Sequence, residues 1–259
     1  MLPREDLLKR SENRELAARL VDLAEQALKT WEPALSHFLS PPEQFEAQRL
    51  FQGLADVAVV TGGGYPQAER RRVGFNRSEL GLLPEQIEVA ALDIAGNFLF
   101  DSATHRDFLG AILGTGITRD KVGDIVVLGE RGAQVLIVPE LAEFLGSTLV
   151  QVRSVPVKVS PIALTDLKVR PPQRKELTTV EASMRLDAIA SAGFGMSRSK
   201  MADLIGSGDV RVNWKTITTA SHALQSGDLV AVSGKGRLEI GEVAVTKKER
   251  YRIQLTRLI

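Results

Sequence analysis

The chain has 259 residues, of which 44% are hydrophobic and 25% are charged, and its net charge at pH 7 is +1. These values are ordinary for a globular protein of one large domain or of two to three small ones. The absence of cysteine excludes disulfides and thiolate metal sites, and it fits a reducing, cytoplasmic location. No apolar run approaches the ~18 residues of a membrane-spanning helix. The first ten residues carry no secretory signal, so we expect no membrane insertion.

The near-neutral net charge hides an asymmetry along the chain. Residues 182–259 contain 12 Lys and Arg against 7 Asp and Glu, a net charge of +5, which leaves −4 for the rest of the chain. A local positive excess attracts a polyanion such as RNA to one end of a protein. We therefore expect a nucleic-acid surface near the carboxyl end.

The acidic, leucine-rich beginning predicts a helical segment over residues 1–54. Leucines recur among charged residues in 4–30, which is the pattern of one or two amphipathic helices. Ser40, two prolines and Glu43 then mark the start of a further helix that we expect to reach about Gln52. Two interpretations of this segment stay open, which are packing on the next domain and binding of a separate partner.

Residues 55–160 predict a central α+β domain in which short apolar strands alternate with helices. Strands are expected at 56–60, 73–75, 87–94, 125–128, 134–138 and 149–159, and helices after Thr104 and at 140–145. Thr104 and Asp107 form a capping box. The Gly-rich loop 61–66 matches neither phosphate-binding pattern, so a flexible turn is favoured over a nucleotide site. Residues 161–182 are the expected linker.

A secondary basic cluster interrupts this otherwise acidic part of the chain. Its members are either phosphate ligands or a solvated surface, and the sequence leaves both interpretations open. The cluster comprises Arg70, Arg71, Arg72, His105, Arg106, Arg119 and Lys121.

Residues 183–259 predict a module of two short helices followed by strands and turns. Apolar spacing marks helices over 186–194 and 198–206, and alternation marks strands at 210–212, 229–232, 243–245 and 252–255. Ser197 is expected to cap the second helix, whose free N–H groups and dipole favour an anion. The candidate RNA-binding residues are Arg185, Ser197, Arg198, Ser199, Lys200, Arg211, Asn213, Lys215, Lys235 and Arg237.

The order of motifs in this module resembles the S4 RNA-binding domain. The motifs are RLD at 185–187, SRSKMADLI at 197–205, GDVRVNxK at 208–215 and LxSGDLV at 224–230. One position departs from the family pattern. Trp214 stands where the family usually has Gly after the Asn of a turn, and Trp does not readily take a positive φ. Two roles for Trp214 stay open, which are stacking on a base and packing on the module's own edge.

The central block adds a more specific resemblance. GGYxxAERRR at 63–72 and THRDFLGAILGxGIxRDKVGDI at 104–125 resemble the YlmH-like proteins, a group that includes the photosystem II S4-domain proteins of cyanobacteria and plastids. The resemblance implies a small N-terminal helical part, a central domain similar to the RNA-recognition-motif fold and a C-terminal S4 module. It also implies rRNA and tRNA as ligands, and association with the large ribosomal subunit in the rescue of stalled translation.

Two other classes of function compete with a non-catalytic RNA binder. An RNA-modifying enzyme would need a catalytic domain, and we find no SAM-type Gly loop, synthetase signature or pseudouridine-synthase motif. The histidines, His37, His105 and His222, are too scattered to suggest a metal site. A partner-recruiting factor linked to photosystem II biogenesis would use the acidic helices. We expect a monomer without enzyme activity, cofactor or metal that selects RNA mostly by shape.

Overall fold

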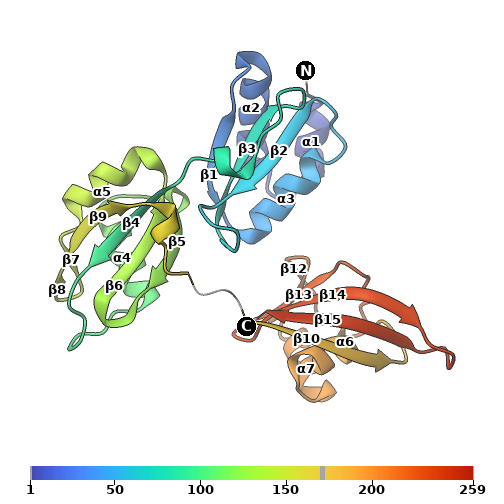
Figure 1. Ribbon diagram of the computed structural model, residues 1–259. Coiled ribbons are helices and arrows are strands. Elements are labelled where there is room, and N and C mark those ends of the chain that lie inside the picture. The colour runs from blue at the N-terminus through green and yellow to red at the C-terminus, as the bar shows by residue number, and fades with distance from the viewer. Residues whose placement is uncertain (1, 170–172, 259) are drawn as a thin grey trace. The chain divides into compact units, whose positions relative to one another are not determined.

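The computed structural model describes residues 2–169 and 173–258 of the chain. The chain divides into two units, Met1–Arg170 and Pro171–Ile259, which are called the N-terminal unit and the C-terminal unit below (Figure 1). The division falls inside the predicted linker 161–182. None of the helices in the described ranges combines the length and the apolar composition needed to span a membrane.

The first half of the N-terminal unit combines helices with a sheet, whose strand β1 falls within residues 1–54, where the sequence predicts helices alone. Its elements are α1 (Arg4–Arg10), α2 (Arg14–Thr30), β1 (Ala34–Leu39), α3 (Pro41–Phe51), β2 (Val57–Gly62) and β3 (Arg71–Arg77). The strands form an antiparallel sheet in the order β1-β3-β2. Because β1 lies before residue 54 while β2 and β3 lie after it, the predicted boundary at 54/55 cuts through one sheet.

Capping and apolar spacing explain the helices of this half. Asn13 caps α2 by accepting a hydrogen bond from the Leu16 amide at 3.1 Å. The predicted capping box of Ser40 and Glu43 is confirmed at the start of α3. At the other end of α3, Phe51 packs on Phe75 of β3 with their ring centroids 4.8 Å apart. Large apolar side chains of this kind each contribute about 1.5–3 kcal/mol when buried.

The second half of the N-terminal unit has the predicted RNA-recognition-motif topology. Its main elements are β4 (Ala90–Ala95), α4 (His105–Gly114), β5 (Val122–Val127), β6 (Gly132–Ile137), α5 (Ala142–Thr148) and β9 (Lys158–Ile162). The chain order is β-α-β-β-α-β, and the antiparallel sheet has the order β5-β6-β4-β9. The capping box of Thr104 and Asp107 starts α4 as predicted.

Short elements complete this half. The long strand predicted at 149–159 is wrong, because the chain turns at Arg153, whose φ is +54°, and divides into β7 (Gln151–Val152), β8 (Val155–Pro156) and β9. Single 3-10 turns lie at η1 (Pro84–Gln86), η2 (Arg119–Lys121), η3 (Gly129–Arg131), η4 (Pro139–Leu141) and η5 (Leu164–Asp166).

The C-terminal unit places two helices on a six-stranded antiparallel sheet (Figure 1). Its elements are β10 (Arg174–Glu181), α6 (Leu186–Phe194), α7 (Arg198–Gly206), β11 (Val210–Val212), β12 (Lys215–Thr216), β13 (Leu229–Val232), β14 (Gly236–Val245) and β15 (Tyr251–Leu258). The sheet order is β10-β15-β14-β13-β11-β12. Both predicted helices are confirmed, whereas β10 occupies much of the predicted linker.

A glycine lets α6 approach the sheet closely. A Cβ atom on Gly193 would lie 2.3 Å from Cδ2 of Leu238 in β14. Leu238 and Ile189 are both fully buried, so α6 covers the face of the sheet to which Leu238 points. The opposite face of the sheet is not part of this core. The charged residues described next are therefore placed by the face of the sheet on which each of them lies.

Candidate nucleic-acid interface

The first turn of α7 carries four of the predicted RNA-binding residues. The hydroxyl of Ser197 caps the helix by accepting from the Lys200 amide at 3.3 Å. Arg198, Ser199 and Lys200 follow in the first turn, and all of them are exposed. Free backbone N–H groups and the helix dipole add partial positive charge at this place. The turn therefore suits an anion, as the sequence predicts.

A buried carboxylate holds two of the predicted cations. Asp187 is 5% exposed. Arg185 donates to it through Nε at 3.0 Å and Nη2 at 2.9 Å, and Arg198 donates through Nε at 3.0 Å and Nη2 at 3.2 Å. Burial alone raises the pKa of Asp187, but the hydrogen bonds from Arg185 and Arg198 outweigh it, so the pKa falls to about 2. Both guanidinium groups are thus fixed by one ionised carboxylate.

Because of this pairing, the candidate RNA-binding residues Arg185 and Arg198 are not two independent cations. One carboxylate neutralises only one guanidinium, so the group of three side chains keeps a net charge of +1. Each guanidinium has five N–H donors, of which Asp187 takes two. The Arg185 and Arg198 side chains are 39% and 56% exposed, so further donors remain for a phosphate. Arginines held in place lose less side-chain entropy on binding. We call Arg185, Arg198 and Lys200 the helix patch.

Arg211 and Arg237 lie on the other face of the sheet. Both residues pair with Ala231, Arg211 from β11 and Arg237 from β14, so their side chains point to the same side. Leu238 follows Arg237 and points into the core under α6, and successive side chains of a strand alternate. The predicted cations therefore occupy two faces, whereas the sequence suggested one. We call Arg211 and Arg237 the sheet patch.

A hollow of about 280 Å³ lies at the sheet patch. It is lined by Arg211 and Arg237 together with Asp209, Ser233 and other residues of β11, β13 and β14. Lys235 is exposed in the turn between β13 and β14, and Lys215 is exposed in β12. The carboxylate of Asp209 lowers the local positive charge, which makes this hollow less attractive to an anion than the first turn of α7.

The turn between β11 and β12 explains the departure at Trp214. Asn213 has φ +48° and Trp214 has φ +67°, so both central residues are left-handed, as in the type I′ turn of a two-residue hairpin. The Asn213 side chain donates to Asp228 at 2.8 Å and accepts from the Leu229 amide at 3.0 Å. Asn213 therefore holds the turn to β13, and this structural role accounts for the residue without the RNA contact, which stays a prediction.

Trp214 packs on the unit itself. Its side chain is half-buried, and the Arg237 guanidinium lies over its ring at 5.2 Å from the centroid. Of the two roles left open by the sequence, this geometry favours packing over base stacking. A left-handed Trp costs about 1–2 kcal/mol, which the interactions of Asn213 and Trp214 offset.

The secondary basic cluster is mostly structural. Arg70 donates to the backbone oxygens of Phe38 at 2.9 Å and Val122 at 3.0 Å, and Arg119 also donates to Val122. Burial lowers the pKa of Arg70 and, to about 10, that of Arg119. Arg70 therefore joins β1 to the start of β5, and so connects the two halves of the N-terminal unit.

The other members of the cluster separate into buried and exposed residues. Arg72 is 5% exposed and donates to the backbone oxygens of Ser36 and Glu88, so it fits neither interpretation that the sequence leaves open for the cluster. Arg71 donates to the oxygens of Ala68 and Pro66, and Lys121 contacts the His37 ring. His105 and Arg106 are exposed in the first turn of α4.

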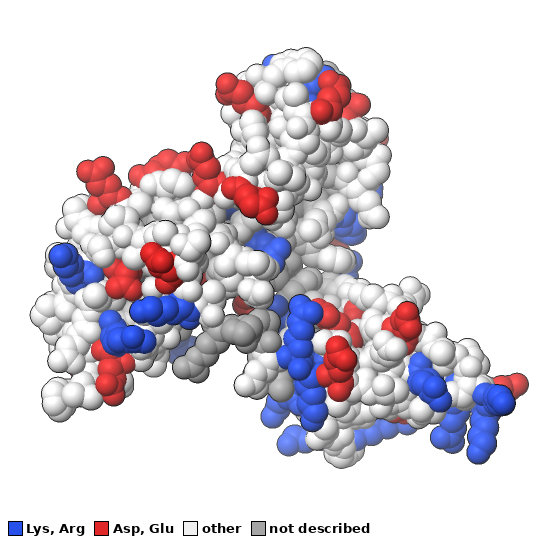
Figure 2. Space-filling view, viewed as in Figure 1, with Lys and Arg blue, Asp and Glu red and all other residues white. Residues whose placement is uncertain are grey.

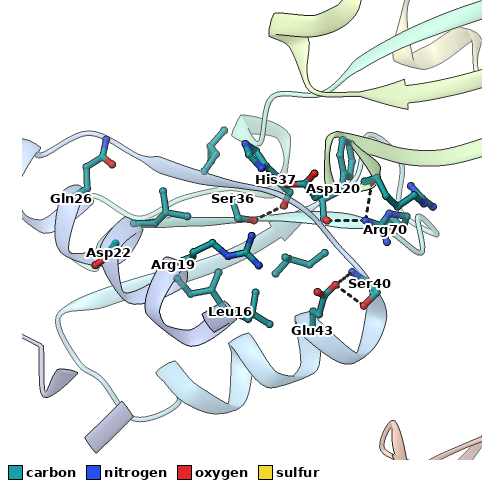
Figure 3. A pocket seen from close by; sticks show the side chains of 16 residues that line it. Leu16, Arg19, Asp22, Gln26, Ser36, His37, Ser40, Glu43, Arg70 and Asp120 are labelled. Atoms are coloured by element: carbon teal, nitrogen blue, oxygen red, sulfur yellow. Dashed lines mark hydrogen bonds and ion pairs between the residues drawn. The ribbon is translucent and has the colours of Figure 1, made fainter. Parts of the chain in front are cut away.

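A cavity of about 570 Å³ adjoins Arg70 and Arg119 in the N-terminal unit. Its floor is made of leucines from α2 and β1, and its rim carries Arg19, Asp22, Glu43 and Asp120 (Figure 3). Charges of both signs face this cavity, so it has no preference for a polyanion.

The sheet face that RNA-recognition motifs use for base stacking is closed in this protein. Such motifs stack bases on aromatic side chains of two central strands, whereas β4 and β6 carry no aromatic residue. A Cβ on Gly123 would lie 2.7 Å from the Phe38 ring of β1, next to Leu136. Gln134 is buried and accepts from the Lys168 amide at 2.7 Å. Residues before and after the domain therefore cover this face.

The fold and the arrangement around α7 define an S4-domain RNA-binding protein. Residues 184–230 match the family profile "S4 domain", residues 84–166 match "Putative RNA-binding domain in YlmH", and residues 12–80 match "YlmH, N-terminal". The chain is also 32% identical over 224 residues, 86% of each chain, to the Ribosome-associated protein quality control protein P2 of Bacillus subtilis (strain 168). The chain therefore belongs to the YlmH family.

A solved structure has the same fold over a large part of the chain. The Cell division protein ylmH from Streptococcus pneumoniae matches with a TM-score of 0.53 and 22% identity, over 61% of this chain and 95% of that chain. The profile limits 12–80 and 84–166 agree with the two sheets of the N-terminal unit.

Proposed function

We propose that this RNA-binding protein is a non-catalytic factor of ribosome-associated quality control. In this proposal it acts in the cytoplasm as a monomer, binds rRNA of the large ribosomal subunit and tRNA, and helps to rescue stalled translation. The Bacillus subtilis relative, whose name describes a ribosome-associated quality control protein, supports the ribosome as its place of action.

The observation that carries the proposal is the helix patch around Asp187. Two guanidinium groups fixed by one buried carboxylate lie beside the exposed first turn of α7. Pre-positioned arginines bind phosphate oxygens with directed hydrogen bonds, and Lys200 adds a mobile charge. These contacts read the backbone of a folded RNA rather than its bases, so selection by shape follows. Ser197 and Ser199 lie close enough in sequence to add hydroxyl contacts to the same phosphate.

Sedimentation of ribosomes tests this function. Tagged protein expressed in its host is expected to sediment with the large ribosomal subunit at low salt and to leave it as salt rises. The double variant Arg198→Ala/Lys200→Ala is expected to remain at the top of the gradient. Sedimentation of the wild-type protein with membranes instead would contradict the proposal and would favour the partner-recruiting role linked to photosystem II.

A further inference from the structure

The hairpin between β14 and β15 presents two lysines at its apex. The Thr246 amide donates to the Arg250 oxygen at 2.7 Å, and the Glu249 amide donates to the Thr246 oxygen at 3.0 Å. Glu249 has φ +55°. This is a three-residue hairpin loop, a type I turn closed by a left-handed residue. Lys247 and Lys248 occupy the two central positions of the turn, and both are exposed.

Two arginines continue this positive charge from the turn into β15. Arg250 directly precedes the strand and Arg252 is its second residue, and both are exposed. Lys247, Lys248, Arg250 and Arg252 together are called the hairpin tip. Figure 2 shows Lys and Arg side chains gathered at the end of the C-terminal unit where this hairpin projects. Glu249 is the single acid within 246–252, so the segment has a net charge of +3.

The hairpin tip is not used by the fold. Within residues 173–258, no hydrogen bond, ion pair or ring contact engages the side chains of its four cations. The helix patch differs in this respect, because Asp187 takes up one of its charges. An open hollow of about 790 Å³ adjoins the tip, lined by the four cations, Thr246 and the apolar residues Val180, Ala244 and Val245. Cations without partners keep their full attraction for an outside anion.

The hairpin tip lies within reach of the helix patch. Glu181 of β10 pairs with Tyr251 of β15, and such partners have Cα atoms about 5 Å apart. The four residues from Glu181 to Arg185 span at most about 14 Å, and the three from Tyr251 to Lys248 span at most about 11 Å. The Cα atoms of Arg185 and Lys248 are therefore at most about 30 Å apart, which is roughly one turn of a nucleic-acid duplex.

We propose that the hairpin tip is a second site for the phosphate backbone of RNA, occupied by the same folded RNA that binds the helix patch. This proposal rests on the RNA-binding function proposed above. An anionic lipid surface would also attract four cations. However, the exposed large apolar side chains beside them are Val180 and Val245, without the Trp or Phe that typically enters a bilayer interface.

The test compares three double variants of the full chain, each of which loses two positive charges. Lys247→Gln/Lys248→Gln changes the hairpin tip at exposed turn positions. Arg198→Gln/Lys200→Gln changes the helix patch. Lys9→Gln/Lys29→Gln is the matched control, because both lysines are exposed on α1 and α2 of the N-terminal unit. Affinity for a labelled stem-loop RNA longer than one helical turn is measured across a salt series, and unfolding curves confirm that each variant folds.

If the tip binds RNA, the variant Lys247→Gln/Lys248→Gln is expected to bind RNA more weakly than the wild-type protein. Its slope of log affinity against log salt should be shallower by about 0.7–0.9 for each phosphate that it no longer binds. The control is expected to bind as the wild-type protein does. If the tip variant matches the control while the helix-patch variant weakens, the second site is refuted and the proposed function stands. If the wild-type protein fails to bind structured RNA, the proposed function itself is wrong. If the tip variant loses binding to phosphatidylserine vesicles but keeps the RNA affinity of the wild-type protein, the tip binds a lipid surface and the proposal is overturned.

Discussion

Arg198 donates through Nε to Oδ2 of Asp187 at 3.0 Å, across a separation of 11 residues in the chain. This bond ties the first turn of α7 to the first turn of α6. The same carboxylate also accepts from the Ala188 amide at 2.9 Å, which anchors it to its own helix. The bond therefore sets the position of α7 relative to α6, and with it the geometry that the helix patch offers to a phosphate.

Asp187→Asn is expected to destabilise the C-terminal unit. The variant keeps the size of the side chain but leaves two adjacent guanidinium groups without a counter-charge, at a cost of about 2 kcal/mol in the free energy of unfolding. Urea unfolding followed by fluorescence of Trp214, with Trp31→Phe in both proteins to remove the second tryptophan, measures the change. Asp203→Asn is the matched control, since this exposed aspartate on α7 is expected to change stability by less than about 0.5 kcal/mol.

The stability of the same unit is expected to depend on Asp187 at low pH. Because its pKa is lowered to about 2, the contribution of its ionised form is fully present above the ordinary value of about 4. It is lost as pH falls through about 2. The wild-type protein should therefore lose roughly 1–2 kcal/mol more than Asp187→Asn between pH 4 and pH 2, after allowance for solvent around the exposed arginines. Parallel curves for the two proteins would show that Asp187 is not held in this way.

Arg198→Ala/Lys200→Ala is expected to weaken binding to all structured RNAs by a similar factor. Phosphate contacts carry no base sequence, so discrimination between RNAs should survive the change. The slope of log affinity against log salt should decrease by about 1.4–1.8 if each of the two side chains binds one phosphate. Filter binding with two unrelated stem-loops checks both statements. An unchanged salt slope would remove Arg198 and Lys200 from the interface.

Substitutions in the β11–β12 turn should separate structure from RNA contact. Asn213→Ala removes two side-chain hydrogen bonds and leaves a left-handed backbone, so we expect a loss of about 2 kcal/mol. Trp214→Gly relieves the left-handed strain but removes the ring that lies beneath Arg237, so the change should stay within about 1 kcal/mol. RNA affinity of Trp214→Gly is measured on the same samples, and a drop of tenfold or more would indicate base stacking.

Arg72→Met is expected to destabilise the N-terminal unit and to leave RNA affinity unchanged. The variant leaves two backbone oxygens, of Ser36 and Glu88, without their donor at a cost of about 2 kcal/mol. Thermal unfolding and RNA titration report on the two properties separately. Arg106→Gln, at an exposed position of α4, is the comparison that should keep wild-type stability.

Local signals in the sequence predict the parts of the fold that depend on neighbours along the chain. The capping boxes at Ser40 and Thr104 and the two helices of the S4 module follow from spacing over a few residues, and they are confirmed. The strand β1 is missed because its burial lacks clean alternation and its partner β3 begins more than thirty residues later. Sheet order depends on such distant pairings, which periodicity does not encode.

The roles of charged residues are harder to predict than the elements that carry them. The sequence places Asp187 in the first turn of a predicted helix, two residues after Arg185, but it does not show that Arg198 folds back onto the same carboxylate. Three consecutive arginines at 70–72 suggest a basic surface. Because β3 begins within this run, Arg72 belongs to a strand whose five interior residues are all buried, and it is held there by the backbone oxygens of Ser36 and Glu88. A run of like charges next to a predicted strand is therefore a signal that some of its members are buried.

The residues that cover the β4–β6 face of the sheet determine which fragments of the chain can fold by themselves. A fragment that starts at β4 would expose Leu136 and Gly123 to water, because Phe38 of β1 lies against this part of the face. Such a piece is expected to aggregate rather than to fold alone. We therefore expect residues 2–169 to fold only together, with the first sheet shielding the second from water and leaving the sheet edges and the helices as the surface open to RNA.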